Sequence, residues 1–164
     1  EVVEVDYYIP GCPPIGEKAW EALIALIKGE RPPKGTVLTA DERTVCDSCP
    51  RVKEEKKIKE LKRIYQVIPD PEKCFLEQGI MCMGPATRGG CDAQCIKAGL
   101  PCKGCFGPAP NAEDQGARML SALASIAEVT SEEEAKKFAE SVADPAGTFY
   151  LFSLPGSLLK RRVK

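Results

Sequence analysis

Cysteines carry the chemistry that this sequence could perform. The chain has nine cysteines and no histidine, so the usual partner ligand of mixed zinc sites is missing. Eight thiols form two sets of four, whereas an odd total of nine fits a disulfide framework poorly. The pattern therefore indicates metal–thiolate chemistry. The eight clustered cysteines are Cys46, Cys49, Cys74, Cys82, Cys91, Cys95, Cys102 and Cys105.

The cysteine spacing favours iron–sulfur clusters and leaves zinc open. From Cys91 onward the order is CxxxC, six residues and then CxxC, with Gly99 and Gly104 interleaved. Small residues let backbone N–H groups approach sulfur, and such hydrogen bonds help to set a cluster potential. Zinc ribbons carry two CxxC knuckles around a hairpin, and nothing between Cys82 and Cys102 alternates like a hairpin. Of the three interpretations of these cysteines, iron–sulfur clusters are the most favoured, followed by zinc sites of four cysteines and then by disulfides.

The composition predicts a loop-rich chain tied together by its metal sites. Fourteen glycines and fourteen prolines are many for 164 residues. Charges nearly balance, with 23 basic and 24 acidic residues, so we expect no nucleic-acid partner. No apolar run approaches the ~20 residues of a transmembrane helix, so we expect no membrane span. The chain opens at Glu1 without a signal peptide, and we expect that its beginning has been removed.

The ninth cysteine, Cys12, follows the predicted strand of a strand–turn–helix unit. Residues 2–9 are β-branched and aromatic, which predicts a strand, and residues 17–28 show helical periodicity. Cys12 lies beyond the carboxyl end of the strand, where open α/β sheets bind ligands, although a small buried hydrophobe is the alternative. One strand cannot cover the apolar helix face, so we expect the rest of the sheet to lie outside this chain. That face consists of Trp20, Leu23, Ile24 and Ile27.

Short capped elements are predicted to carry the cysteine blocks. Asp41 is the expected N-cap of a turn that holds Cys46 and Cys49, and Asp70 that of a short helix presenting Cys74. Downstream, Asn111 should cap a helix over 112–128, and Ser131 with Glu134 should form a capping box for another helix. The basic segment 51–63 is either a docking patch for an acidic electron-transfer partner or a solvated face, and charge runs are usually the latter.

Five stretches of this sequence carry a family resemblance. They are VDYYIPGCPP, TVCDSCPR, CFLEQGIMCMGPATRGGC, PCKGCFGP and GTFYLFSLP. From Val5 onward the chain resembles the small subunit of nickel–iron hydrogenases, closest to the cytosolic archaeal methyl-viologen-reducing (deazaflavin-non-reducing) type. The resemblance implies a cytoplasmic, hetero-oligomeric oxidoreductase linked to methanogenesis, with the active site on a large partner subunit. Electrons from hydrogen would pass through three clusters to a redox partner, an iron–sulfur or flavin protein, and no residue of this chain would be catalytic.

The resemblance also implies a role for each cysteine. Cys12 resembles the last ligand of the proximal cluster, whose other ligands would lie in a flavodoxin-like domain missing from this chain. Periplasmic relatives have proline where this chain has Cys95 and carry a 3Fe–4S medial cluster, so a 4Fe–4S medial cluster is expected here. Two clusters would thus lie within the chain and a third would be shared. The implied distal ligands are Cys46, Cys49, Cys74 and Cys82, and the implied medial ligands are Cys91, Cys95, Cys102 and Cys105.

These observations predict an α+β fold with two parts. Residues 1–28 would be the last strand–helix unit of a flavodoxin-like α/β domain, and residues 29–164 a loop- and helix-rich iron–sulfur domain with its clusters in 46–105. One alternative function is a zinc-stabilised interaction module. Another is the cluster subunit of a hydrogenase-related respiratory complex, against which the block from Cys74 to Cys105 counts.

Overall fold

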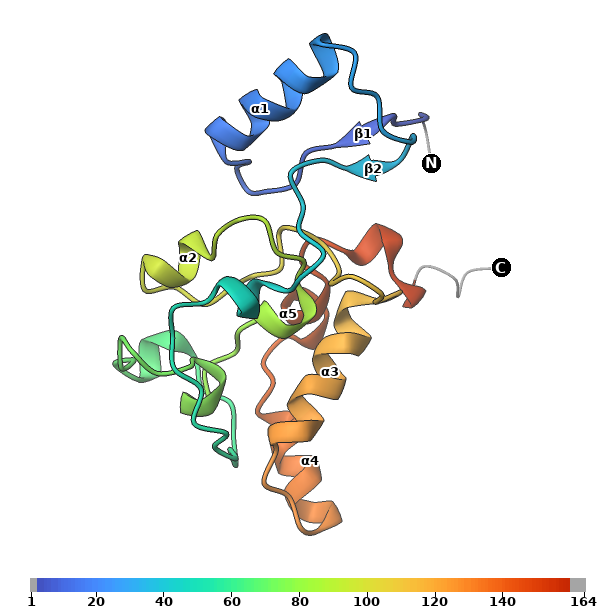
Figure 1. The fold of residues 1–164 in the computed structure, drawn as a ribbon. Coiled ribbons are helices and arrows are strands. Elements are labelled where there is room, and N and C mark those ends of the chain that lie inside the picture. The colour runs from blue at the N-terminus through green and yellow to red at the C-terminus, as the bar shows by residue number, and fades with distance from the viewer. Residues whose placement is uncertain (1–2, 160–164) are drawn as a thin grey trace.

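The computed structural model describes residues 3–159, which form a small N-terminal βαβ unit above a larger loop-rich body (Figure 1). Strand β1 (Tyr7–Tyr8) pairs in parallel with β2 (Thr36–Val37), and helix α1 (Gly16–Ile27) connects them. The helix predicted over 17–28 is confirmed. The strand predicted over 2–9 is wrong in extent, because β1 pairs with only two residues of β2; Val2 lies outside the described residues.

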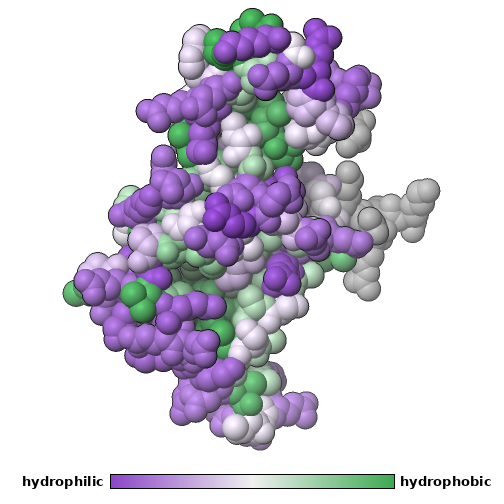
Figure 2. Space-filling view, viewed as in Figure 1, coloured by the Kyte–Doolittle hydropathy of each residue, from purple (hydrophilic) through white to green (hydrophobic). Residues whose placement is uncertain are grey.

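The apolar face of α1 is open to solvent, as predicted. The helix has no buried residue, and Trp20 and Ile27 are 64% and 78% exposed. Hydrophobic atoms are visible among the charged side chains of this unit in Figure 2. Because β2 joins the unit, it reaches Val37, while the domain division at residue 28 and the flavodoxin-like origin of the unit stay predictions.

The body is built from short turns followed by helices. Its 3₁₀ turns are Val45–Ser48, Ile64–Gln66, Leu76–Gln78, Gly84–Ala86 and Leu154–Gly156, and its helices are α2 (Gln94–Lys97), α3 (Gln115–Ile126), α4 (Glu132–Glu140) and α5 (Pro145–Tyr150). Helix α3 packs against the turn at Gly84–Ala86 and against α5. With the parallel strand pair, this is a mixed helix and sheet architecture rich in loops, consistent with the predicted α+β class. Among the described residues, no helix combines the length and apolarity that crossing a bilayer requires.

Asp114, not Asn111, caps helix α3. The Asp114 carboxylate accepts a hydrogen bond from the Ala117 N–H at 2.8 Å, because Asp114 is the extended residue just before the first helical turn. Ser131 caps α4 as predicted and accepts from the Glu134 N–H at 3.2 Å. The Glu134 carboxylate accepts from the N–H of Thr130, one residue further back than a capping box places it.

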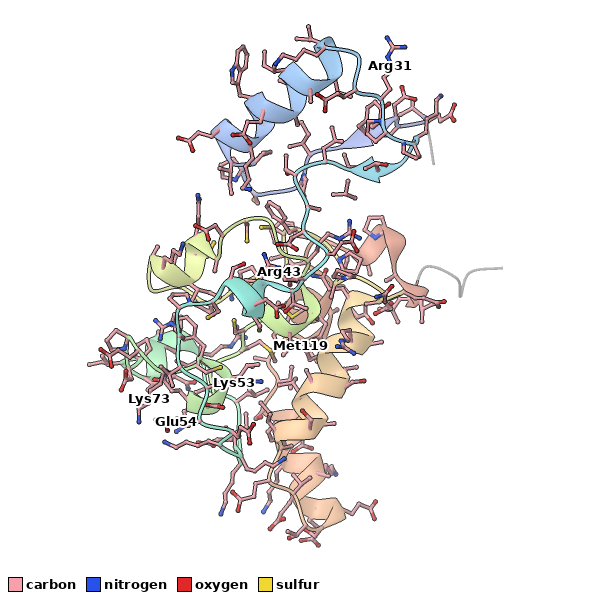
Figure 3. The ribbon with its side chains drawn as sticks, in the orientation of Figure 1. Arg31, Arg43, Lys53, Glu54, Lys73 and Met119 are labelled. Atoms are coloured by element: carbon pink, nitrogen blue, oxygen red, sulfur yellow. The ribbon has the colours of Figure 1, made fainter. Side chains whose placement is uncertain are left out.

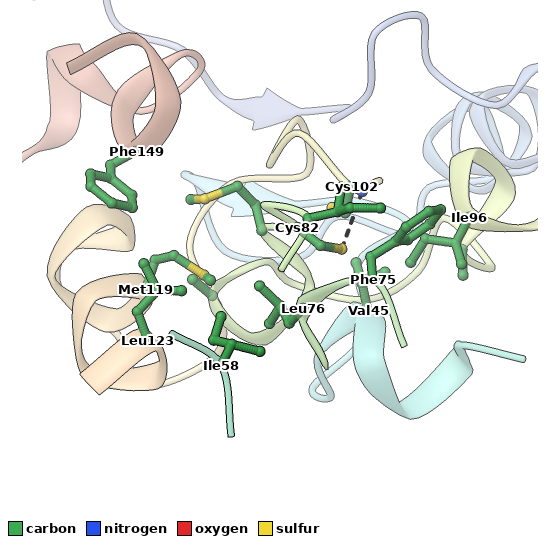
Figure 4. Packing of buried hydrophobic residues seen from close by; sticks show 14 of the residues in the cluster. Val45, Ile58, Phe75, Leu76, Cys82, Ile96, Cys102, Met119, Leu123 and Phe149 are labelled. Carbon is green, nitrogen blue, oxygen red and sulfur yellow. Dashed lines mark hydrogen bonds between the residues drawn. The ribbon is translucent and has the colours of Figure 1, made fainter. Parts of the chain in front are cut away.

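The core joins the cysteine loops to helix α3. Figure 4 shows Met119 and Leu123 of α3 packing near Leu76 and Ile58, with Phe75 and Val45 on the far side of the two buried cysteines. The basic segment 51–63 is extended rather than helical, and part of it belongs to this core. Ile58 is buried and bridges Ala127, while the Leu61 N–H donates to Ser141 Oγ at 3.0 Å. These contacts favour a structural role for the segment. The largest fully buried side chains of the body are Phe75, Ile80, Met119, Gln115, Val45 and Thr87.

Candidate metal centre

All nine cysteines lie in the described part of the chain, and none forms a disulfide. Figure 3 shows yellow sulfur atoms gathering in the body between α2 and α3. For clarity, the Cys46 group denotes Cys46, Cys49, Cys74 and Cys82, and the Cys105 group denotes Cys91, Cys95, Cys102 and Cys105.

Two thiols of the Cys46 group lie near Gly84, where an added Cβ would be 3.0 Å from Cys46 Sγ and 3.7 Å from Cys82 Sγ. Burial raises the pKa of Cys46 to about 12, and the negative charges of Cys49 and Cys74 raise it further. Burial likewise raises the pKa of Cys82 to about 12, although the N–H groups of Gly84 and Cys102 oppose the shift. Cys46 is exposed as a residue, yet its Sγ would lie only 3.0 Å from a Cβ added to Gly84, so the thiol points inward.

The turn that carries Cys46 is closed by a local capping box. The Asp47 carboxylate accepts from the N–H and the hydroxyl of Thr44 at 2.8 and 2.6 Å. Asp41 is therefore not the cap, and its carboxylate instead pairs with the guanidinium of Arg43 at 2.7 Å. Thr44 takes the role because it is the extended residue directly before the turn.

The loop that carries Cys74 is held by hydrogen bonds within its own neighbourhood. Asp70 Oδ1 accepts from the N–H groups of Glu72 and Lys73 at 2.9 and 3.3 Å, so Asp70 closes the loop before Cys74. The predicted helix capped by Asp70 is wrong, because Cys74 lies in a loop and the turn Leu76–Gln78 begins after Phe75. Gly79 ends the following turn at a positive φ of 77°, which glycine adopts without strain. The Gln78 carboxamide also donates a hydrogen bond to the Lys73 carbonyl group of this loop, a contact that the sequence analysis did not predict.

Arg51 supports the same loop and carries a donor without a partner. Its Nη1 donates to the carbonyl oxygens of Asp70 and Lys73 at 2.6 and 2.9 Å, and its guanidinium lies 3.7 Å from the centroid of the Phe75 ring. The Arg51 Nε is buried and has no hydrogen-bond partner among the described residues. A buried N–H without a protein partner, on a side chain that bonds the carbonyl group of the residue before Cys74, suits a site that holds an anionic group.

The Cys105 group lines a cavity of about 740 Å³. Burial raises the pKa of Cys105, and the negative charges of Cys91 and Cys95 add to the shift, so these thiols lie close together. Cys95 sits on the short helix α2, and burial raises the pKa of Cys102 to about 12. Cys12 lines the same cavity, so the N-terminal unit places its only cysteine against this group.

The two groups meet at Cys82 and Cys102, which are both buried. The Cys102 N–H donates to Cys82 Sγ at 3.3 Å, drawn as the dashed line in Figure 4, and the Met83 N–H donates to the Cys102 carbonyl at 2.9 Å. Backbone donors to sulfur are typical of cluster sites, where they help to set the potential. One ligand block of each group is thereby tied to the other.

A buried polar network on α3 fixes the loop from Cys102 to Cys105. Gln115 Nε2 donates to the carbonyl oxygens of Gly104 and Gly107 at 3.0 and 3.1 Å and to the Thr87 hydroxyl at 3.2 Å. Gly104 has a φ of 92°, and a Cβ there would lie 2.9 Å from Gln115 Nε2. The loop therefore approaches Gln115 as closely as only glycine permits. Sequence reasoning missed Gln115, because its partners are distant in the chain.

The donor set fits a group that takes thiolate ligands. Within residues 3–159, no three histidine, thiol or carboxylate side chains converge as a lone metal ion requires. The buried thiols are neutral at pH 7 by themselves, since burial raises their pKa, and a bound cationic centre would hold them as thiolates. Sulfur-only ligands, a cavity beside one group and N–H donors aimed at sulfur all suit iron–sulfur clusters.

Comparison with known proteins places the chain among hydrogenase subunits. No protein-family model matches it. It is 40% identical over 169 residues to a subunit of the F420-non-reducing hydrogenase of Methanothermobacter marburgensis, covering 100% of this chain and 53% of that protein. It is 41% identical over 168 residues to the iron–sulfur subunit of the F420-non-reducing hydrogenase of Archaeoglobus profundus, covering 99% and 51%. Over 107 residues it is 49% identical to the corresponding subunit of Methanothermus fervidus, covering 63% and 84%.

The match runs through the whole chain, but the chain spans about half the length of the first two relatives. All three relatives are named as the same subunit of an F420-non-reducing hydrogenase, and the chain covers most of the Methanothermus fervidus protein. This chain belongs to the family of F420-non-reducing hydrogenase iron–sulfur subunits.

Proposed function

We propose that this chain is the cluster-bearing part of the small, electron-transferring subunit of a nickel–iron hydrogenase, an oxidoreductase that acts on hydrogen. Its relatives are named hydrogenase subunits, and the one from Archaeoglobus profundus is named an iron–sulfur subunit. One observation carries the proposal. The N–H of Cys102, which belongs to one predicted ligand group, donates to the sulfur of Cys82, which belongs to the other.

Each group holds one 4Fe–4S cluster. Cys12 provides one ligand to a third, proximal cluster, because one thiolate cannot hold a cluster alone and the remaining ligands belong to residues outside this chain. Its place on the wall of the Cys105 cavity supports this, since a proximal cluster there adjoins the medial one. The distal ligands are Cys46, Cys49, Cys74 and Cys82, and the medial ligands are Cys91, Cys95, Cys102 and Cys105.

The residues of this chain position sulfur and exclude water. When bound, the clusters supply one-electron chemistry at potentials between roughly −700 and +450 mV. Buried Val45 and Phe75 keep solvent from the Cys46 group, and the N–H of Cys102 holds Cys82 Sγ in place. Electron transfer requires no general base and no open coordination position. The described residues around the cysteines supply backbone donors and apolar walls, as such a relay needs.

The arrangement gives the relay a direction. Electrons enter on the side of Cys12, from a nickel–iron site on the large partner subunit, and leave on the side of the Cys46 group. Cys12 lines the cavity of the Cys105 group, whose lining includes no member of the Cys46 group. The acceptor is a redox partner subunit with a cluster or a flavin. Nine unpaired cysteines suit the reducing cytoplasm, where we place the complex.

Metal analysis of the protein, purified without oxygen, tests this function. The expected result is about eight irons and eight sulfides for residues 1–164, with paramagnetic resonance signals of two reduced 4Fe–4S clusters. A colourless protein with two zinc ions would instead make the chain a zinc-stabilised interaction module. A protein with neither metal would overturn both.

A further inference from the structure

Two glutamine carboxamides occupy equivalent places in the two halves of the centre. Gln78 lies at the end of the turn Leu76–Gln78, beside the loop of Cys74, and Gln115 lies at the start of α3, beside the loop of Cys102 and Cys105. The side-chain amide of each glutamine donates hydrogen bonds to main-chain carbonyl groups of a cysteine loop. Neither side chain is a ligand, and the relay proposed above does not use them.

Gln115 is buried and makes long-range contacts. It is 2% exposed, and Nε2 donates to the carbonyl groups of Gly104 and Gly107 and to the Thr87 hydroxyl. The Thr87 hydroxyl in turn donates to the Met83 carbonyl at 2.6 Å. Met83 follows a ligand of the other group, and Thr87 lines the Cys105 cavity. The network therefore ties the CxxC loop both to α3 and to the junction between the groups.

Gln78 makes short-range contacts with a similar pattern. Its Nε2 donates to the carbonyl oxygens of Lys73, Cys74 and Asp70 at 2.9, 3.2 and 3.3 Å, and its Oε1 accepts from the Asp70 N–H at 2.7 Å. Arg51 also bonds the carbonyl groups of Asp70 and Lys73. The Cys74 loop thus has two side-chain supports. Within residues 3–159, Gln115 provides the side-chain bonds to the Gly104 and Gly107 carbonyl groups, which also accept from the N–H groups of Gly107 and Arg88.

We infer that Gln78 and Gln115 are positioning residues, each for one of the two clusters, and that the Cys105 group depends more on its glutamine than the Cys46 group does. This inference rests on the proposed function. A carboxamide that fixes a ligand loop sets where the loop N–H groups point relative to sulfur. Those N–H···S contacts tune the potential and spectrum of a cluster, so each glutamine acts on one signal.

The test compares Gln115→Met with Gln78→Met in the protein as it occurs in the cell, isolated without oxygen. Methionine keeps the length and volume of glutamine but cannot donate to the loop carbonyl groups. Redox titration followed by paramagnetic resonance measures each cluster separately. We expect Gln115→Met to shift the midpoint potential and resonance signal of the Cys105-group cluster alone. Gln78→Met should shift only the other cluster, and by less. The conversion of the Cys105-group cluster to 3Fe–4S in Cys95→Pro assigns the two signals.

Thr87→Val provides a milder second variant in case Gln115→Met does not fold. It removes the hydroxyl that Gln115 bonds while keeping the shape of the side chain, and it should shift the same signal as Gln115→Met in a smaller amount. Unchanged potentials in all the variants that fold, or equal shifts of both clusters in each of them, would overturn the inference. Absence of clusters from the unsubstituted protein would overturn the proposed function instead, so the two failures are distinguishable.

Discussion

The Cys46 group and the Cys105 group each provide four cysteine sulfur atoms, but different contacts hold the loops that carry them. In the Cys46 group, hydrogen bonds between residues near one another in sequence hold the loops. These bonds join Thr44 to Asp47 and Asp70 to Gln78. The Cys105 group depends on Gln115, which reaches Gly104 across 11 residues and Thr87 across 28. The comparison teaches that short-range bonds close single loops of the Cys46 group, although Arg51 reaches the Cys74 loop across 19 and 22 residues, whereas the Cys105 group requires α3 to be docked.

The junction at Cys82 gives the strongest test of this division. Cys82→Ala removes a ligand of the Cys46 group and also the sulfur that accepts the Cys102 N–H. We expect the Cys46-group cluster to lose iron, as for any ligand of that group, together with a shifted signal from the Cys105-group cluster. Cys46→Ala is the matched control and should lose the same iron without that shift. Identical resonance spectra of the two variants would show that the junction does not couple the groups.

Cys95→Pro should change one group and leave the other intact. Proline near the start of α2 is tolerated by a helix, and the variant removes one thiolate from the Cys105 group. The expected product is a 3Fe–4S cluster, with one iron lost of about eight and a higher midpoint potential. Paramagnetic resonance of the oxidised protein checks this. If no 3Fe–4S signal forms, Cys95 is not a ligand.

The substitutions Gly104→Ala and Gly84→Ala test how well each cysteine group accommodates an added Cβ. Gly104 has a φ of 92°, and a Cβ there meets Gln115 Nε2 at 2.9 Å, whereas a Cβ on Gly84 meets Cys46 Sγ at 3.0 Å without a positive φ. We expect Gly104→Ala to lower the free energy of unfolding by about 1–3 kcal/mol. Gly84→Ala should cost less. Denaturant titration measures both, and an equal cost would count against a tighter fit at Gly104.

The smallest effect concerns Asp114, which joins α3 to the C-terminal segment. Its carboxylate also accepts from the Tyr150 hydroxyl at 2.9 Å and the Leu158 N–H at 2.8 Å. Burial alone would raise the pKa of Asp114, but these bonds and that from Ala117 lower it below its usual value. Asp114→Ala should therefore cost about 1 kcal/mol at pH 7.

The pH dependence follows from the direction of that shift. A lowered folded-state pKa means that the stabilisation is complete above the unfolded value of about 4 and is lost as the pH falls through the folded value. The difference in unfolding free energy between Asp114→Asn and the unsubstituted protein should thus shrink below about pH 4. Denaturant titrations at several pH values measure it. A difference that stays constant would mean that Asp114 does not titrate with folding.

Local patterns predicted the elements that local physics builds. The helix predicted from the periodicity of residues 17–28 and the Ser131 cap appear in the structure because each depends on neighbours a few residues away. Strand β2 was not predicted, because Thr36 and Val37 are too few to show a periodicity and form a strand only by pairing with β1. The wrong caps at Asp41 and Asn111 arose because several nearby polar residues compete, and backbone conformation selects among them.

The sequence by itself determined which chemistry to expect, because the cysteine count and spacing and the absence of histidine favour thiolate ligands. Only the tertiary structure decided how the groups relate. The contact of Cys82 with Cys102, the entry of Cys12 into the Cys105 cavity and the reach of Gln115 join residues that are distant in the chain. The physical reason is that such contacts arise from packing around α3 and carry no local signature, since a hydrogen bond depends on position in space rather than on separation along the sequence.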